Sequence, residues 1–198
     1  MYLHRSAELL DDFAPHLSGF ERAGLDESPA TILGVRPDFT IGYVNAAWWR
    51  FAAENGGGHA FAWGPGSELL SVIPHRLRMF YRSHLGRVFD GAERWEHDYL
   101  CSSPTEERMY RLRAVPLPGR AALISHVLSI VMYRDDGQPF DASRFVASTG
   151  ILTMCCHCRC TKDPHDDHWY WVPSLVERPR SRTSHALCAT CSTYYYPP

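Results

Sequence analysis

Two pairs of cysteines near the end of the sequence constrain its folding more than any other feature. Cys155 and Cys158 form the first pair and Cys188 and Cys191 the second, and two residues separate the cysteines of each pair. A turn with this spacing can direct two thiolates at one point, and two such turns supply the four soft ligands that tetrahedral Zn²⁺ favours. We therefore expect residues 151–198 to fold around a metal ion, since so short a segment cannot build a large core.

The distribution of the cysteines argues against a disulfide-rich secreted domain. Six of the seven lie between Cys155 and Cys191, and only Cys101 lies outside this segment. A secreted scaffold would spread its cysteines and need an export signal, but residues 1–8 contain no apolar stretch. We therefore expect a cytoplasmic protein with reduced thiols. Structural zinc is the favoured interpretation, and an iron centre and a metal-free redox dithiol remain as alternatives.

Four further side chains lie beside the cysteine pairs. Cys156 and Cys160 are spare thiols, which could replace a ligand or make the site sensitive to oxidation. His157 and His185 could each replace one thiolate, or both could be surface histidines; the question is more open for His185, which leads directly into the second pair. His157, inside the first pair, is interpreted as a surface histidine.

The charge and hydropathy of the chain restrict its partners. The formal net charge is −2 at pH 7, and the segment after residue 150 is close to neutral. A zinc module that binds nucleic acid usually has a clear basic excess, so we do not expect nucleic acid as a partner. The longest apolar stretch, residues 121–132, is interrupted by Ser125 and His126 and is too short to span a bilayer, so we expect no membrane association.

Hydrophobic periodicity predicts an α+β fold before the cysteine-rich segment. An amphipathic helix is predicted at residues 6–13, and later helices at 46–54, capped by Asn45, and at 74–90, opened by Pro74. Five strands are predicted at residues 30–35, 40–44, 94–101, 108–115 and 121–132. This order indicates a five-stranded antiparallel sheet with helices on one face.

The order of these elements resembles a PAS domain over about residues 25–135. The resemblance is carried by Pro37-Asp38 in the first turn and by the sequence Tyr-Val-Asn-Ala-Ala-Trp at residues 43–48. Residues 95–104 and 108–117 look like a subgroup of bacterial PAS sensors. The cysteine pairs, with Ser184-His185 before the second, resemble a tail found behind bacterial PAS and receiver domains, although Cys160 and Ala186 depart from that pattern.

The resemblance implies a domain organisation and a ligand pocket. We expect an N-terminal helical cap at 1–24, a PAS-like domain at 25–135, a linker at 136–150 and a zinc-binding module at 151–198. A PAS core can hold a small ligand, here of unknown identity, and the candidate pocket residues are Trp48, His84, Trp95 and Cys101. His84 is the candidate haem ligand, but its surroundings do not match those of haem-binding PAS domains. Cys101 is interpreted as a small apolar residue at a strand end rather than a nucleophile.

These observations predict a regulatory protein without catalytic output. Four thiolates close a zinc site to substrates, and no Gly-x-Ser-x-Gly or His-Glu-x-x-His sequence occurs, so we expect no enzyme. The predicted function is signal sensing through contact with an unknown signalling protein. A homodimer is expected, since PAS domains commonly dimerise through an N-terminal helix such as residues 6–13. The alternatives are a nucleic-acid-binding transcriptional regulator that uses the zinc module, or a redox or haem sensor.

Overall fold

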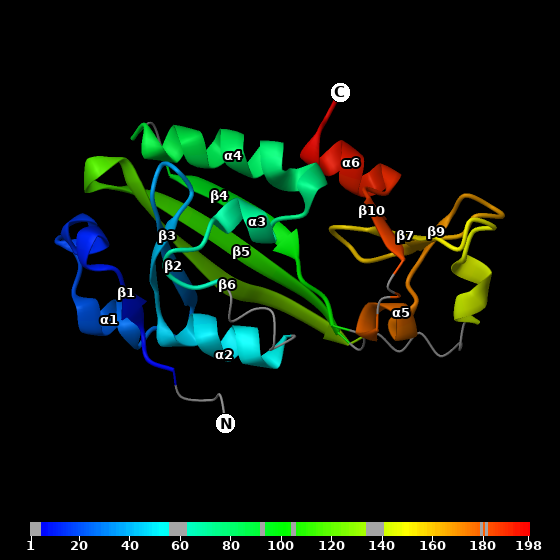
Figure 1. Cartoon of the computed structure of the whole chain (residues 1–198), viewed down its shortest axis with the longest axis horizontal. Helices are drawn as coiled ribbons and strands as arrows, with labels where there is room; N and C mark the ends of the chain where they lie inside the picture. Colours follow the sequence, from blue (N-terminus) through cyan, green and yellow to red (C-terminus); the bar gives the residue numbers. More distant parts are fainter. Residues whose placement is uncertain are drawn as a thin grey trace. The chain divides into compact units, whose positions relative to one another are not determined.

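The computed structural model describes residues 5–55, 63–91, 94–103, 106–133, 141–178, 180 and 182–198 (Figure 1). The chain separates into two compact units: the first combines Met1–Asp98 with Arg111–Val127, and the second combines Tyr99–Tyr110 with Leu128–Pro198. Each unit combines segments that are distant in sequence, and the predicted boundaries at residues 24, 135 and 150 stay predictions. Residues 136–140 of the predicted linker lie outside the described residues.

A six-stranded sheet contains the five predicted strands and one more, which confirms the α+β class. The strands follow the order β1-β3-β2-β6-β5-β4, and β2 pairs antiparallel with both β3 and β6. The strands are β1 (Glu8–Leu9), β2 (Thr31–Val35), β3 (Ile41–Val44), β4 (Trp95–Leu100), β5 (Glu106–Leu117) and β6 (Ala121–Tyr133). The accompanying helices are α1 (Arg22–Asp26), α2 (Ala46–Glu54), α3 (Leu69–Val72) and α4 (His75–Phe89), with 3-10 helices η1 (Asp11–Leu17) and η3 (Pro118–Arg120).

Two helices begin where the sequence predicts. Asn45 caps α2, because its side-chain oxygen accepts the backbone N–H of Trp48 at 3.1 Å. Pro74 precedes α4, which ends before Gly91, a glycine with the positive φ of 74° that favours this residue after a helix. Four apolar residues of α4 are buried, namely Leu77, Leu85, Val88 and Phe89.

The prediction of an α-helix at residues 6–13 is wrong. Residues 8 and 9 form β1, which pairs antiparallel with β3, and the Leu10 N–H donates to the Gly42 carbonyl at 2.9 Å. The following residues form η1, a 3-10 helix with Pro15 inside it; proline lacks the N–H that an α-helix would use. Phe13 is fully buried in the core of its own unit, so this segment presents no free apolar helix for a dimer.

The second unit contains a small sheet of its own, which the sequence pattern does not predict. Its order is β10-β7-β8-β9, with β7 (Leu152–Cys155), β8 (Thr161–Lys162), β9 (Trp169–Tyr170) and β10 (Thr183–Ala186). The other elements are η4 (Ala142–Phe145), α5 (Pro173–Glu177) and α6 (Ala189–Tyr195). A core of Phe145, Leu152, Met154, Val172 and Leu175 lies beside this sheet. β7 and β10 pair in parallel, which places Ala186 opposite Cys155 and brings the two cysteine pairs to the same end of the sheet.

Candidate metal centre

The first cysteine pair lies in a tight reversal at the end of β7. The Cys155 N–H donates to the Cys160 carbonyl at 2.8 Å, and the Arg159 N–H donates to the Cys155 carbonyl at 3.1 Å. Arg159 has a positive φ of 63°, the left-handed conformation that lets the chain turn back sharply. This turn directs the sulfurs of Cys155 and Cys158 toward the same point.

The second cysteine pair opens helix α6. Cys188 is the residue before the helix and has an extended conformation, and Cys191 lies in the first turn. The partial positive charge of a helix N-terminus favours a thiolate at that position. The backbone N–H of Cys188 donates to the sulfur of Cys155 at 3.4 Å, so the two pairs are in direct contact.

The four sulfur atoms form a group compact enough to bind one metal ion. The Sγ atoms of Cys155, Cys158, Cys188 and Cys191 all lie within 4.8 Å of one another, and those of Cys158 and Cys188 are 3.8 Å apart. A tetrahedral zinc ion with Zn–S bonds of about 2.3 Å requires sulfurs about 3.8 Å apart, so the group needs little adjustment to hold one. Three of the four cysteines are buried. The structure thus brings together the four predicted ligands.

The protonation of the thiols shows why such a group favours a cation. Hydrogen bonds from Cys155, Cys160 and Cys191 lower the pKa of Cys158, which makes its sulfur the favoured thiolate. Burial raises the pKa of Cys188 to about 11, and hydrogen bonds to the neighbouring sulfurs raise the pKa of Cys191. Several thiolates cannot ionise side by side without compensation, whereas a coordinated divalent cation deprotonates them.

The residues beside the pairs have different environments. His185 is exposed and lies outside the four-sulfur group. Cys156 and Cys160 are half-buried and also lie outside it, although Cys160 hydrogen-bonds to Cys158. The interpretation of His157 as a surface histidine is wrong, because its ring is half-buried and reaches the Cys191 sulfur through Nδ1 at 3.3 Å.

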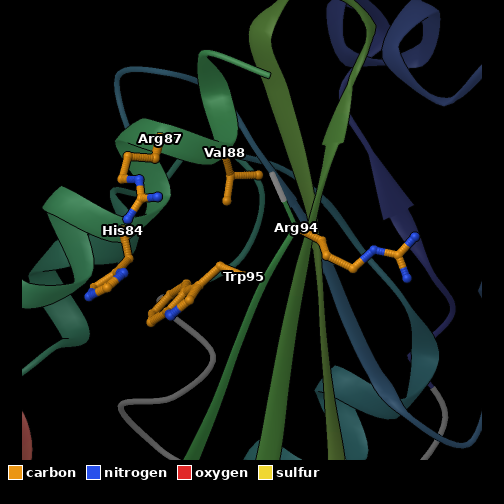
Figure 2. Close-up of a pocket in the computed structure, with 5 residues that line it drawn as sticks. All are labelled: His84, Arg87, Val88, Arg94 and Trp95. Carbon is orange, nitrogen blue, oxygen red and sulfur yellow. The ribbon is translucent and has the colours of Figure 1, made fainter. Parts of the chain in front are cut away.

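Two of the four predicted pocket residues, His84 and Trp95, line one small pocket. His84 and Trp95 have stacked rings with centroids 4.9 Å apart, and together with Arg87, Val88 and Arg94 they line a pocket of about 60 Å³. Figure 2 shows the Arg94 guanidinium pointing away from the other four side chains. Ligand pockets commonly measure about 300–1,000 Å³, so this hollow does not accommodate a group of the size of haem.

Trp48 and Cys101 do not line this pocket. The Trp48 indole N–H donates to the Trp63 carbonyl at 3.1 Å. Cys101 belongs to the second unit, where burial raises the pKa of its thiol and so disfavours the thiolate that a nucleophile requires.

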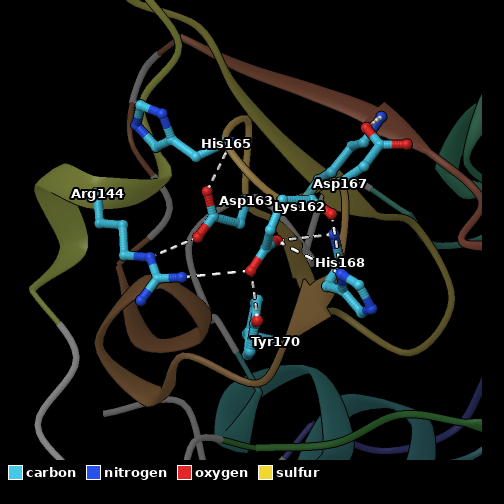
Figure 3. A network of polar contacts seen from close by, with 8 residues as sticks. Arg144, Lys162, Asp163, His165, Asp167, His168 and Tyr170 are labelled. Atoms are coloured by element: carbon cyan, nitrogen blue, oxygen red, sulfur yellow. Dashed lines mark hydrogen bonds and ion pairs between the residues drawn. The ribbon is translucent and has the colours of Figure 1, made fainter.

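A polar network in the second unit has no counterpart in the sequence predictions (Figure 3). Asp163 is fully buried, forms an ion pair with Arg144 and accepts the backbone N–H of His165 at 2.8 Å. Asp166 accepts the Tyr170 hydroxyl at 2.6 Å and contacts Arg144 at 3.3 Å. A buried carboxylate that accepts a backbone N–H of its own loop and pairs with an arginine holds that loop in place, so we assign this network a structural role. An aspartate with an arginine 19 residues earlier carries no recognisable sequence signal.

Comparison with known proteins finds similarity among solved structures only. No family model matches the chain, and no curated protein matches it. The PAS domain of the RpfR quorum-sensing receptor of Cronobacter turicensis, solved with C12:0, is 13% identical with a TM-score of 0.41, covering 52% of this chain and 97% of that domain. The PAS domain of an HTR-like protein of Haloarcula marismortui is 17% identical with a TM-score of 0.36, covering 61% of this chain and 100% of that domain. Among the described residues, no helix has the length and apolar character needed to cross a membrane.

Proposed function

We propose that this chain is a signal-sensing module of the PAS type, that one structural zinc ion holds its cysteine-rich segment together, and that it acts by contact with another protein. The order of elements that carries the resemblance, two strands followed by helices and three strands, is present in the six-stranded sheet. The zinc part rests on the group of four sulfurs within 4.8 Å of one another. Four thiolates leave no coordination position for a substrate, so the proposal includes no enzymatic activity.

Zinc is proposed rather than iron because the site resembles a fold-stabilising centre. Tetrahedral four-sulfur sites can hold either metal. Here the four cysteines lie at one end of a small sheet. The core beside this sheet consists of five residues, Phe145, Leu152, Met154, Val172 and Leu175. A bound ion would add stability that so small a core lacks. Reduced cysteines of this kind fit a cytoplasmic location, which is part of the proposal.

Elemental analysis of protein purified under reducing conditions tests the metal assignment. We expect one zinc and no iron per chain in the wild-type protein. Cys188→Ser should lose the zinc, whereas Cys101→Ser, a cysteine outside the four-sulfur group, should retain it. Iron in place of zinc would overturn the metal identity, and zinc retained by Cys188→Ser would overturn the ligand set.

Nucleic acid is not the proposed partner, because the net charge of the chain is −2 and gives no general attraction to phosphates. Binding to a random-sequence duplex that weakens steeply with salt would contradict this part of the proposal. A Soret band lost in His84→Ala would likewise contradict the absence of haem.

Self-association is a further part of the proposal. Leu128, Ile130, Val131 and Met132, in the last part of β6, are between 40% and 52% exposed. An exposed apolar stretch of this kind is typical of an interface between proteins. Light scattering at micromolar concentration should give the mass of a dimer, and a monomeric mass would argue against it.

A further inference from the structure

His157 lies within the first cysteine turn, and both nitrogens of its ring have partners. The ring nitrogen Nε2 lies 3.0 Å from the backbone N–H of Leu100, the last residue of β4. The other nitrogen, Nδ1, lies 3.3 Å from the Cys191 sulfur. The rings of Tyr194 and Tyr195 flank the imidazole, with centroids 6.1 Å and 4.9 Å away, and keep its plane in this orientation.

These two contacts fix which nitrogen carries the proton. A backbone N–H can only donate a hydrogen bond, so Nε2 must accept from Leu100 and cannot carry a hydrogen itself. A neutral imidazole then carries its hydrogen on Nδ1, the nitrogen that faces Cys191. A metal-bound thiolate is an acceptor, and the Nδ1–H group points at it with the matching polarity.

We propose that His157 is a positioning residue of the metal centre, which donates its Nδ1–H to the thiolate of Cys191 while Leu100 holds the ring in the required tautomer. This inference rests on the proposed metal site. The hydrogen bond orients the sulfur and withdraws part of its negative charge, and partners of this kind tune the strength of the metal–ligand bond. His157 therefore adjusts a site in which four cysteines are the ligands.

Two substitutions separate the hydrogen bond from the packing of the ring. His157→Phe retains an aromatic ring between the two tyrosines but removes both nitrogens. His157→Asn places an amide N–H close to the position of Nδ1 and can restore the donor to Cys191. His185→Phe is the matched control, because His185 is exposed and lies outside the four-sulfur group.

The first measurement is zinc per chain, which should be one in all four proteins because the cysteines are intact. We then expect the zinc affinity of His157→Phe, measured by competition with a chromophoric chelator, to fall about 10- to 100-fold. The thiolate-to-metal charge-transfer band of the Co²⁺-substituted protein should move to lower energy. His157→Asn should recover most of the affinity and of the band position, and His185→Phe should behave as wild type.

The results that would contradict the metal site differ from those that would contradict the role of His157. A wild-type protein that binds neither Zn²⁺ nor Co²⁺ overturns the metal site and this inference with it. If zinc is bound but His157→Phe matches wild type, or His157→Asn is no better than His157→Phe, the metal site stands and the role of His157 is overturned. Nitrogen-15 NMR of the zinc-loaded protein gives an independent readout: a protonated Nδ1 supports the inference, and a protonated Nε2 overturns it.

Discussion

The backbone N–H of Cys188 points at the sulfur of Cys155, 3.4 Å away, and joins the start of α6 to the end of β7. A hydrogen bond of this kind is strongest when the sulfur is a thiolate, because a charged acceptor strengthens the bond. Binding of a metal ion, which requires a thiolate at Cys155, would therefore strengthen this contact between the two cysteine pairs.

Metal uptake should release protons. Cys188, with a pKa raised to about 11, and Cys191, with a raised pKa, both carry protons at pH 7 before the metal binds. Coordination removes at least these two protons, so the zinc affinity should rise by at least about 100-fold per pH unit near neutrality and fall as the pH is lowered. Calorimetry in buffers of different ionisation enthalpy measures the number released. A value near zero would mean that the thiols are already ionised.

Asn45 should be the most sensitive polar residue of the first unit. Its side chain is fully buried, accepts the Ile32 N–H at 3.0 Å and donates to the Ala30 carbonyl at 2.8 Å, in addition to capping α2. Asn45→Ala removes the cap and leaves buried backbone groups without partners, so we expect a loss of about 2–5 kcal/mol in the free energy of unfolding.

Urea denaturation followed by circular dichroism checks this loss. Asn55→Ala, at the other end of the same helix and exposed, is the matched control and should cost less than about 1 kcal/mol. Equal effects at the two positions would show that the contacts of Asn45 contribute no more than an ordinary surface hydrogen bond.

Two ion pairs of the second unit should differ in their contribution to stability. Arg144→Met leaves the fully buried Asp163 without its cation, and we expect a clear fall in the midpoint of thermal unfolding, because an unpaired buried carboxylate is costly. Lys162→Met breaks a pair with Asp167, which is 83% exposed, and should change stability by less than about 1 kcal/mol. Thermal unfolding of the zinc-loaded variants measures both, and the reverse ranking would contradict the structural role of Asp163.

Gly42 and Gly86 should respond in opposite directions to replacement by alanine. A Cβ atom at Gly42 would lie 2.2 Å from the Phe13 ring, so Gly42→Ala should destabilise the first unit by about 1–3 kcal/mol. A Cβ atom at Gly86, inside α4, meets nothing within 4 Å. Gly86→Ala should therefore stabilise the protein by about 0.5–1 kcal/mol, because alanine is the better helix former. The midpoint of thermal unfolding should fall in Gly42→Ala and rise in Gly86→Ala. A stabilising Gly42→Ala would mean that Phe13 does not cover β3.

The sequence predicts those features that depend on local contacts. Asn45 and Pro74 can be recognised as helix starts because each acts on the residues that follow it. The four cysteines can be grouped because their spacing reflects two short turns. The N-terminal strand could not be recognised, because β1 exists only through its pairing with β3, more than 30 residues later. Likewise, the role of His157 depends on Leu100, which is 57 residues away.

The parallel pairing of β7 with β10 also sets an order of events during synthesis. The Cys155 turn leaves the ribosome first, and its partner Cys188 follows 33 residues later. Parallel neighbours cannot be joined by a tight hairpin, so the whole connection that contains β8, β9 and α5 must be synthesised before the four sulfurs can meet. Until then the first two sulfurs form only an incomplete chelate. If the four cysteines bind a metal ion, its tight retention would mark a chain whose second cysteine pair has reached the first.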